Sequence, residues 1–169
     1  MNVLRSALLT TIPRELRAVK REIEAYPDEA SLWRPVPGIS NTGGTLALHV
    51  AGNLRHFFGA ILGHDGFTRD REAEFARRDV PRAELLEGID AAIASVEGTL
   101  KALSDDAMAA PYPEPIAKRT LPTSVWLMHL ATHLAYHLGQ IDYHRRAVTG
   151  ASPSQTVDAV SVRELPEVT

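Results

Sequence analysis

The chain has 169 residues, of which 44% are hydrophobic, and a formal net charge of −3. This length and apolar content are sufficient for one domain with a sizeable core. The weak net charge and the lack of a basic block give no reason to expect nucleic acid as a partner. The sequence has no run of eighteen apolar residues that would indicate a membrane span, and no apolar region after Met1 that would indicate a secretory signal. We therefore expect a soluble, cytoplasmic protein without a membrane partner. The chain has no cysteine, which excludes disulfides, a thiolate nucleophile and sulfur ligands for a metal.

The first predicted element is an amphipathic helix over residues 3–25, where apolar side chains recur at three- and four-residue spacings. Pro13 is expected to kink this helix or to break it near its first turns. The sequence Tyr26-Pro27-Asp28 ends it. Residues 30–40 contain two prolines and a glycine, which predicts an extended connection.

A second helix is predicted to start after Ser40 or Asn41, both good N-cap residues, and to run to Gly63. Its core face includes Asn53, and His49 flanks that face. His56 lies a heptad after His49, about 10 Å along the axis, so only one of the two can reach a given point in the fold.

Residues 64–80 carry many charges of both signs, which predicts a solvated loop with a short helical piece at most. A third helix is expected from Pro81, at its first position, to near Leu103. Residues 104–122 contain four prolines and are predicted to be a long connection without regular structure. The fourth helix should open within residues 120–124 and end before Gly150.

Four helices and no convincing strand predict an all-α fold, a four-helix bundle with long connections. The two long connections, residues 26–41 and 64–80, indicate a topology other than simple up-down-up-down. We expect one domain over residues 1–150, followed by a polar C-terminal tail over residues 151–169 that packs loosely or is partly disordered.

The fourth helix concentrates the chemistry of the chain. Four of the seven histidines lie in it, namely His129, His133, His137 and His144. His133 and His137 are four residues apart, so their β-carbons lie about 5–6 Å apart on one face. Two such imidazoles can close on one ion at about 2.0–2.1 Å each, with a third ligand from another helix. Spacing alone leaves the alternative that these histidines are ordinary core or boundary residues. Leu134 stands where the His-Glu-x-x-His metalloproteases carry their general base, which argues against a peptidase.

Three parts of the sequence resemble the DinB-like (YfiT-type) metal-binding bundles. They are His49 early on the second helix, the loop over residues 69–75, and the pattern Thr132-His133-x-x-Tyr136-His137-x-Gly139-Gln140. The resemblance implies that His49, His133 and His137 hold a divalent metal ion. Three imidazoles suit zinc, nickel, copper and iron alike, and we expect zinc or nickel. Leu138 stands where the family often has arginine, which is not a ligand.

Three neutral imidazoles leave a divalent ion with a charge near +2, which favours an anionic fourth ligand such as hydroxide, carboxylate or thiolate. Gln140, Asn53 and Tyr136 are the candidates for catalytic residues beside the metal. His129 and His144 are candidates for contacts with the substrate or with the metal-binding histidines, and the sequence does not decide their roles.

The resemblance extends to thiol-dependent enzymes, such as bacillithiol S-transferases and mycothiol-dependent isomerases. It implies a transferase that acts on a small-molecule substrate with a low-molecular-weight thiol as cosubstrate. One alternative is hydrolysis by a metal hydroxide, against which the weak basicity of Asn53, Tyr136 and Gln140 counts. Another is a non-catalytic metal- or ligand-binding bundle. A homodimer is also expected, from the resemblance and from apolar residues in the connections, namely Phe67, Phe75 and Tyr112.

Overall fold

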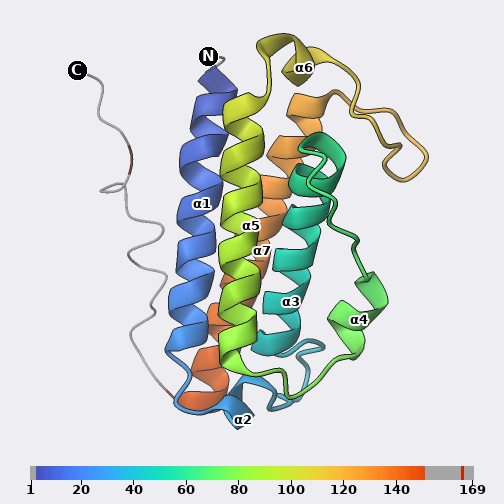
Figure 1. Cartoon of the computed structure of the whole chain (residues 1–169). Helices are drawn as coiled ribbons and strands as arrows, with labels where there is room; N and C mark the ends of the chain where they lie inside the picture. The colour runs from blue at the N-terminus through green and yellow to red at the C-terminus, as the bar shows by residue number, and fades with distance from the viewer. Residues whose placement is uncertain (1–2, 151–164, 166–169) are drawn as a thin grey trace.

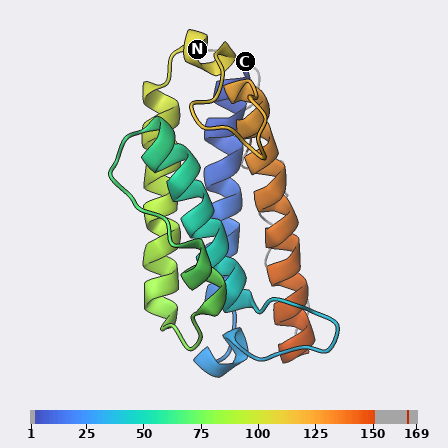
Figure 2. The same ribbon diagram turned by 90° about the vertical axis from the view of Figure 1, so that its right-hand side faces the viewer.

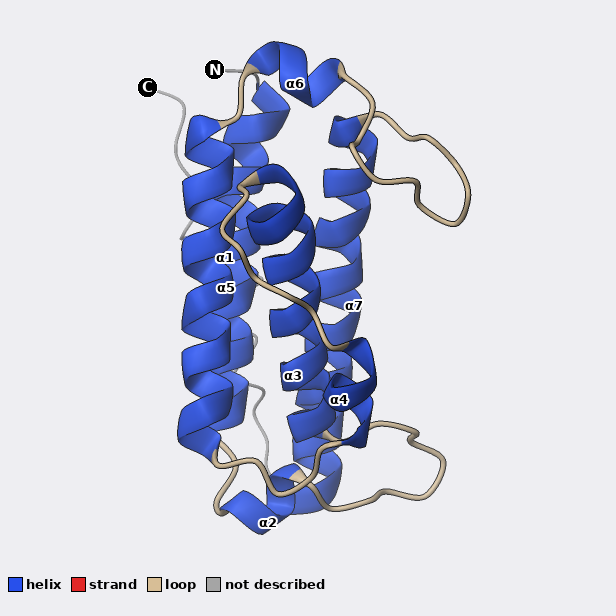
Figure 3. Cartoon of the chain, turned by 45° about the vertical axis from the view of Figure 1, so that its right-hand side comes forward, coloured by secondary structure: helices blue, strands red, loops and turns tan. Residues whose placement is uncertain are grey.

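A computed structural model describes residues 3–150 and residue 165, and within them the chain is helical with no strand (Figure 3). The helices are α1 (Val3–Glu24), α2 (Glu29–Leu32), α3 (Gly43–Leu54), η1 (Arg55–Leu62), α4 (Arg71–Ala76), α5 (Arg82–Ala102), α6 (Asp105–Ala109) and α7 (Thr123–Thr149). None of the described helices is long and apolar enough to cross a bilayer. The predicted tail lies outside the described residues, apart from Leu165.

Four long rods make up the bundle: α1, the continuous α3 and η1, α5, and α7 (Figure 1). They pack in a ring in which α1 and α3 each contact both α5 and α7. In Figure 1, α1 and α7 run downward, whereas α3 and α5 both run upward. Parallel α3 and α5 need a long return, which residues 63–81 supply and which carries α4. The all-α prediction is confirmed, and the order of directions differs from simple alternation, as the long connections predict.

The core lies where the apolar stripes of the four rods meet. Each rod contributes side chains that are at most 1% exposed, for example Leu16, Val50, Ile89 and Leu134. Burying one such side chain stabilises the fold by about 1.5–3 kcal/mol relative to leaving it in water. This packing fixes how α3 and α7 face each other, and the candidate site is built on those two helices.

Two short helices occur where irregular connections were predicted. The carboxylate of Asp28 accepts a hydrogen bond from the backbone N–H of Ser31, which caps α2. In the same way Ser104 accepts from the N–H of Ala107 and caps α6. The predictions for these segments were wrong because a single capped turn is too short to show a periodic pattern.

The long helices differ from prediction at two further points. Pro13 lies buried inside a continuous α1, so the predicted break does not occur. The N-cap of α3 is Thr42, whose side chain accepts from the N–H of Thr45, rather than Ser40 or Asn41. The end of α7 agrees with prediction, since Gly150 follows it in the left-handed conformation (φ 66°).

The last two turns of the second rod form a π-helix, η1. Its wider turn leaves carbonyl groups that accept hydrogen bonds from elsewhere: the Thr99 hydroxyl of α5 donates to Phe58 O (2.9 Å) and the Tyr112 hydroxyl donates to Phe57 O (2.7 Å). The predicted end of this helix at Gly63 is close to the observed one, but the π-form is not visible in the sequence. Such segments are rare and occur frequently at functional sites, and η1 begins six residues after His49.

Candidate metal centre

Three histidines from two helices meet where α3 packs against α7. His49 comes from α3, and His133 and His137 come from α7; one nitrogen of each lies within 4.8 Å of the others. The Nε2 atoms of His133 and His137 are 3.0 Å apart. Two ligand atoms that each lie about 2.0–2.1 Å from one ion are separated by roughly 2.9–3.4 Å at tetrahedral or octahedral angles. The two histidines of α7 are therefore spaced as ligands of one ion would be, and a nitrogen of His49 lies within 4.8 Å of both.

A carboxylate fixes the ring of His49. Its Nδ1 lies 3.0 Å from Oε2 of Glu74 on α4, and both side chains are buried. With Nδ1–H donating to the carboxylate, Nε2 keeps its lone pair for a metal. Metal-binding histidines commonly donate their other ring N–H to a carboxylate in this way, which fixes the tautomer and raises the basicity of the ligand.

Arg69 in turn holds Glu74. Its Nε donates to Oε1 (2.7 Å) and its Nη2 donates to Oε2 (2.8 Å), a two-point contact with the carboxylate. Burial by itself raises the pKa of Glu74, but the hydrogen bonds from Arg69 and His49 and the charge of Arg69 outweigh it, so the net pKa is below its usual range. Glu74 is therefore ionised at neutral pH.

A glycine on α3 makes room for this carboxylate. A Cβ added at Gly52 would collide with Oε1 of Glu74. Gly52 lies one turn after His49, so the absence of a side chain there lets α4 approach the ligand closely. In Figure 3, α4 lies in front of the lower part of α3.

On α7, Gln140 orients His137. Its Oε1 lies 2.7 Å from Nδ1 of His137, which directs the lone pair of Nε2 toward His133 and His49. Burial lowers the pKa of His137; the hydrogen bond with Gln140 opposes this, and the charge of His49 adds to it. Burial, followed by the charges of His137 and His49, lowers the pKa of His133 to about 4. Both imidazoles are therefore neutral at pH 7, the state that binds a metal.

The other predicted candidates have separate places around the three histidines. Asn53 is buried one turn after His49, and within residues 3–150 its Oδ1 has no hydrogen-bond partner. Tyr136 is 65% exposed, with its ring 5.4 Å from that of His137, so it lies on the rim of the site. His129 stacks on Trp126 with ring centroids 4.9 Å apart, and its ring centroid lies 6.1 Å from that of His133.

His144 belongs to the packing about two turns beyond His137 on α7, where α7 meets Tyr26 and the start of α3. It is fully buried; its Nδ1 accepts from the hydroxyl of Tyr26 (2.7 Å) and its Nε2 donates to the carbonyl of Arg34 (3.0 Å). It is therefore a structural residue rather than part of the site. His56 also lies outside the three histidines and pairs with Glu114 at 3.3 Å.

Sequence reasoning missed Arg69 and Glu74 because the charges of residues 64–80 predict a solvated surface. It missed Gly52 because a glycine in a helical pattern indicates only a weak point of the helix. One available signal was Phe75, an apolar residue in that charged segment, which needs a covering partner. Its ring packs against His49 with centroids 4.9 Å apart.

The residues that supported the homodimer prediction are not free apolar surface. Tyr112 is buried, the Arg55 guanidinium lies 3.9 Å over the ring of Phe67, and Phe75 packs on His49. The exposed apolar residues are elsewhere, mainly on α7.

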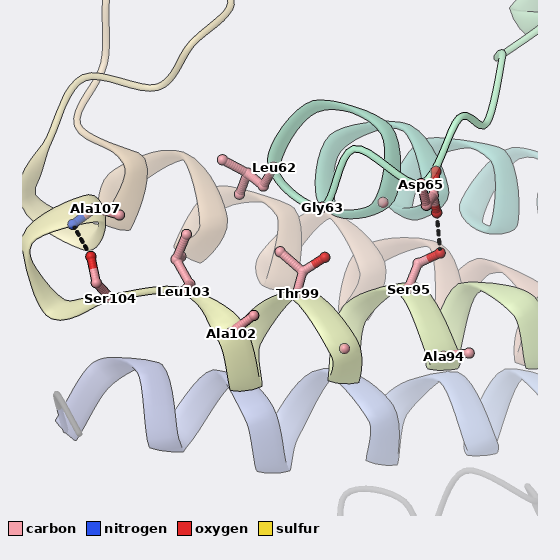
Figure 4. Close-up of a pocket in the computed structure, with 12 residues that line it drawn as sticks. Leu62, Gly63, Asp65, Ala94, Ser95, Thr99, Ala102, Leu103, Ser104 and Ala107 are labelled. Carbon is pink, nitrogen blue, oxygen red and sulfur yellow. Dashed lines mark hydrogen bonds between the residues drawn. The ribbon is translucent and has the colours of Figure 1, made fainter.

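A cavity of about 640 Å³ lies away from the histidines, between the end of η1, α5 and α6 (Figure 4). Small and apolar residues line most of it, and a hydrogen bond from Ser95 to Asp65 (3.0 Å) spans one side. No residue of the candidate metal centre lines this cavity.

The family model described as the DinB superfamily matches residues 9–141, a range that contains all three histidines, Glu74 and Gln140. No curated protein and no solved structure matches the chain.

Proposed function

Because the chain belongs to the DinB superfamily, we propose that it is a divalent-metal enzyme that transfers a low-molecular-weight thiol to a small electrophilic substrate. The observation that supports this proposal is the convergence of three imidazole nitrogens within 4.8 Å. Two of these rings are oriented through their second nitrogen, His49 by Glu74 and His137 by Gln140. Zinc and nickel both suit such ligands.

The donor set favours an anionic partner for the metal. The three ligands are neutral, and Glu74, the acidic side chain in contact with them, is already engaged by Arg69 and His49. A divalent ion held this way supplies a positive charge that lowers the pKa of a thiol, which is then a nucleophile at neutral pH. Because the chain has no cysteine of its own, the thiol must come from outside.

In the proposed transfer, the thiolate sulfur forms a bond to an electrophilic carbon of the substrate, and the leaving group departs with the bonding electron pair. Gln140 and Glu74 hold His137 and His49 in place. Asn53 supports the binding of a polar ligand, since its buried Oδ1 has no hydrogen-bond partner among the described residues. A ligand that donates a hydrogen bond to this oxygen would satisfy it.

Hydrolysis by a metal hydroxide is the second candidate. It needs a general base close to the metal. The ionised Glu74 has its two oxygens occupied by Arg69 and His49, and Tyr136 and Gln140 are poor bases. The thiol reaction needs no such base once the thiol is ionised, which favours it over hydrolysis.

Cobalt-substituted protein tests the proposal directly. Adding a suitable thiol from a panel that includes bacillithiol and mycothiol should produce a sulfur-to-metal charge-transfer band, and transfer to chlorobimane should exceed the uncatalysed rate. H137A should lose both, whereas H64A, at an exposed loop position, should keep both. An unchanged spectrum with every thiol and no transfer would remove the thiol proposal.

A further inference from the structure

A cavity of about 390 Å³ lies where α3, α5 and the connection over residues 67–77 meet. Figure 2 shows this connection, in green, descending beside α3 and α5 and leading into α4. Apolar and small residues of the two long helices form part of its lining, namely Leu48, Ala51, Gly52 and Gly88. Small-molecule sites in proteins have volumes of about 300–1,000 Å³, so the cavity can hold a small metabolite with an aliphatic part.

The charged side chains around this cavity fall into two groups. Four of the six have hydrogen-bond or ion-pair partners among the described residues, namely Asp70, Glu74, Arg77 and Glu84. The other two, Arg55 of η1 and Glu87 of α5, have neither a hydrogen bond nor an ion pair within residues 3–150. The cavity is therefore lined by one unpaired positive group and one unpaired negative group, which come from different helices and do not touch each other.

An aromatic ring holds the guanidinium of Arg55 in place. Its Cζ lies 3.9 Å above the centre of the Phe67 ring. This contact occupies the face of the guanidinium and leaves the N–H donors at its edge for a ligand. Nε is buried without a partner in the described chain, whereas the two terminal nitrogens remain accessible. A carboxylate can accept from both terminal nitrogens at once, which is the geometry that arginine favours.

The mixed charge selects against ligands that carry a single charge. A ligand with only a negative charge would meet the carboxylates of Asp70, Glu84 and Glu87 around the same cavity, and a ligand with only a positive charge would meet Arg55. A zwitterion satisfies both unpaired groups. We propose that this cavity binds an aliphatic α-amino acid, whose carboxylate accepts from Arg55, whose ammonium group donates to Glu87, and whose side chain lies against the apolar lining.

This site is distinct from the three histidines, although the two share a wall. Glu74 lines the cavity and also orients His49. The proposed contacts use neither a metal ion nor a thiol. The inference therefore stands independently of the proposed transferase activity, and the failure of one leaves the other intact.

Isothermal titration calorimetry with three matched ligands tests the proposal. They are L-leucine, 4-methylvalerate, which is leucine without its ammonium group, and isoamylamine, which is leucine without its carboxylate. Wild type should bind L-leucine, and it should bind each analogue at least about tenfold more weakly, because each loses a hydrogen bond to a charged group. This comparison needs no variant.

Two variants then assign the contacts. R55M and E87Q should each bind L-leucine at least about tenfold more weakly than wild type. R55M should still bind isoamylamine as well as wild type does, and E87Q should still bind 4-methylvalerate as well, since the contact with the remaining group is intact. R71M and E72Q, which change exposed residues of α4 outside the cavity, are the matched controls and should bind L-leucine normally.

An amino acid can also chelate a metal, so H137A is included and should keep its affinity for L-leucine. Binding that is lost in H137A but kept in R55M and E87Q would place L-leucine on the metal and overturn the proposal. Wild type that does not bind L-leucine would overturn it too. An analogue that binds as tightly as L-leucine would show that the two charges are not recognised together, which would also contradict it.

Discussion

Glu74 has a role at the candidate site that the spacing of the histidines alone does not reveal. It aligns His49 through one oxygen while Arg69 binds both of its oxygens. A ligand that loses such a partner typically binds its metal 10- to 100-fold more weakly, or about 1.4–2.7 kcal/mol. A sequence reading could find His133 and His137 from their spacing and His49 from the resemblance. It could not find Glu74, because 25 residues and a change of helix separate it from His49.

We therefore predict that E74Q weakens metal binding about 10- to 100-fold, because His49 loses the carboxylate that orients its ring. E72Q changes an exposed residue of the same short helix and should bind as wild type does. Competition with a chromophoric chelator measures both affinities. Equal affinities for the two variants would show that Glu74 does not support the ligand.

About two turns beyond His137 on α7, His144 should make stability depend on pH. Burial lowers the pKa of this imidazole in the folded chain, so protons favour the unfolded chain, in which the pKa is about 6.5. Its contribution is complete above about pH 6.5 and is lost as the pH falls below that value. The free energy of unfolding of wild type should exceed that of H144Q at pH 7, and the difference should shrink toward pH 5. Urea titrations measure it, and a difference independent of pH would contradict this assignment.

Among the elements, the long helices could be predicted and the short ones could not. The start of α7 falls within the predicted residues 120–124 and its end before the predicted Gly150, whereas α2 and α6 depend on single caps. The π-form of η1 was also beyond prediction; the hydroxyls that donate to its Phe57 and Phe58 carbonyls, from Tyr112 and Thr99, lie more than 40 residues further along the chain. The close approach of α4 to α3 depends on Gly52, which in the sequence alone is only a weak point in a helix.

Substitution by alanine distinguishes a glycine that allows the close approach of another helix from a glycine that only weakens its own helix. G52A should weaken metal binding, because the added methyl group displaces Glu74. G98A, in α5, is the matched control: its methyl group meets no atom within 4 Å, and it should raise the free energy of unfolding by about 0.5–1 kcal/mol without affecting the metal. Chelator competition and urea unfolding measure the two effects. A G52A protein with wild-type metal affinity would show that α4 can shift without cost to the site.

For the whole molecule, a buried charge cluster joins the first and last helices. Arg145 of α7 donates to Glu22 of α1 and lies 3.4 Å from Asp142. Removing one partner of a buried pair leaves uncompensated charge and costs about 3–5 kcal/mol. R145M should lose about that much stability, whereas R146M, which removes a half-exposed partner of the same Asp142, should stay within about 1 kcal/mol of wild type. Similar losses in urea unfolding of both variants would contradict a special role for the buried pair.

The central claim is that His49, His133 and His137 bind one divalent ion together. The most direct test is the metal content of protein purified without a chelator or a metal-affinity column and then supplied with zinc or nickel. Wild type should retain one ion per chain by elemental analysis; H49A, H133A and H137A should each retain little, and H56A should retain as much as wild type. Wild type without bound metal, or an H49A protein that keeps its metal while H56A loses it, would contradict the account.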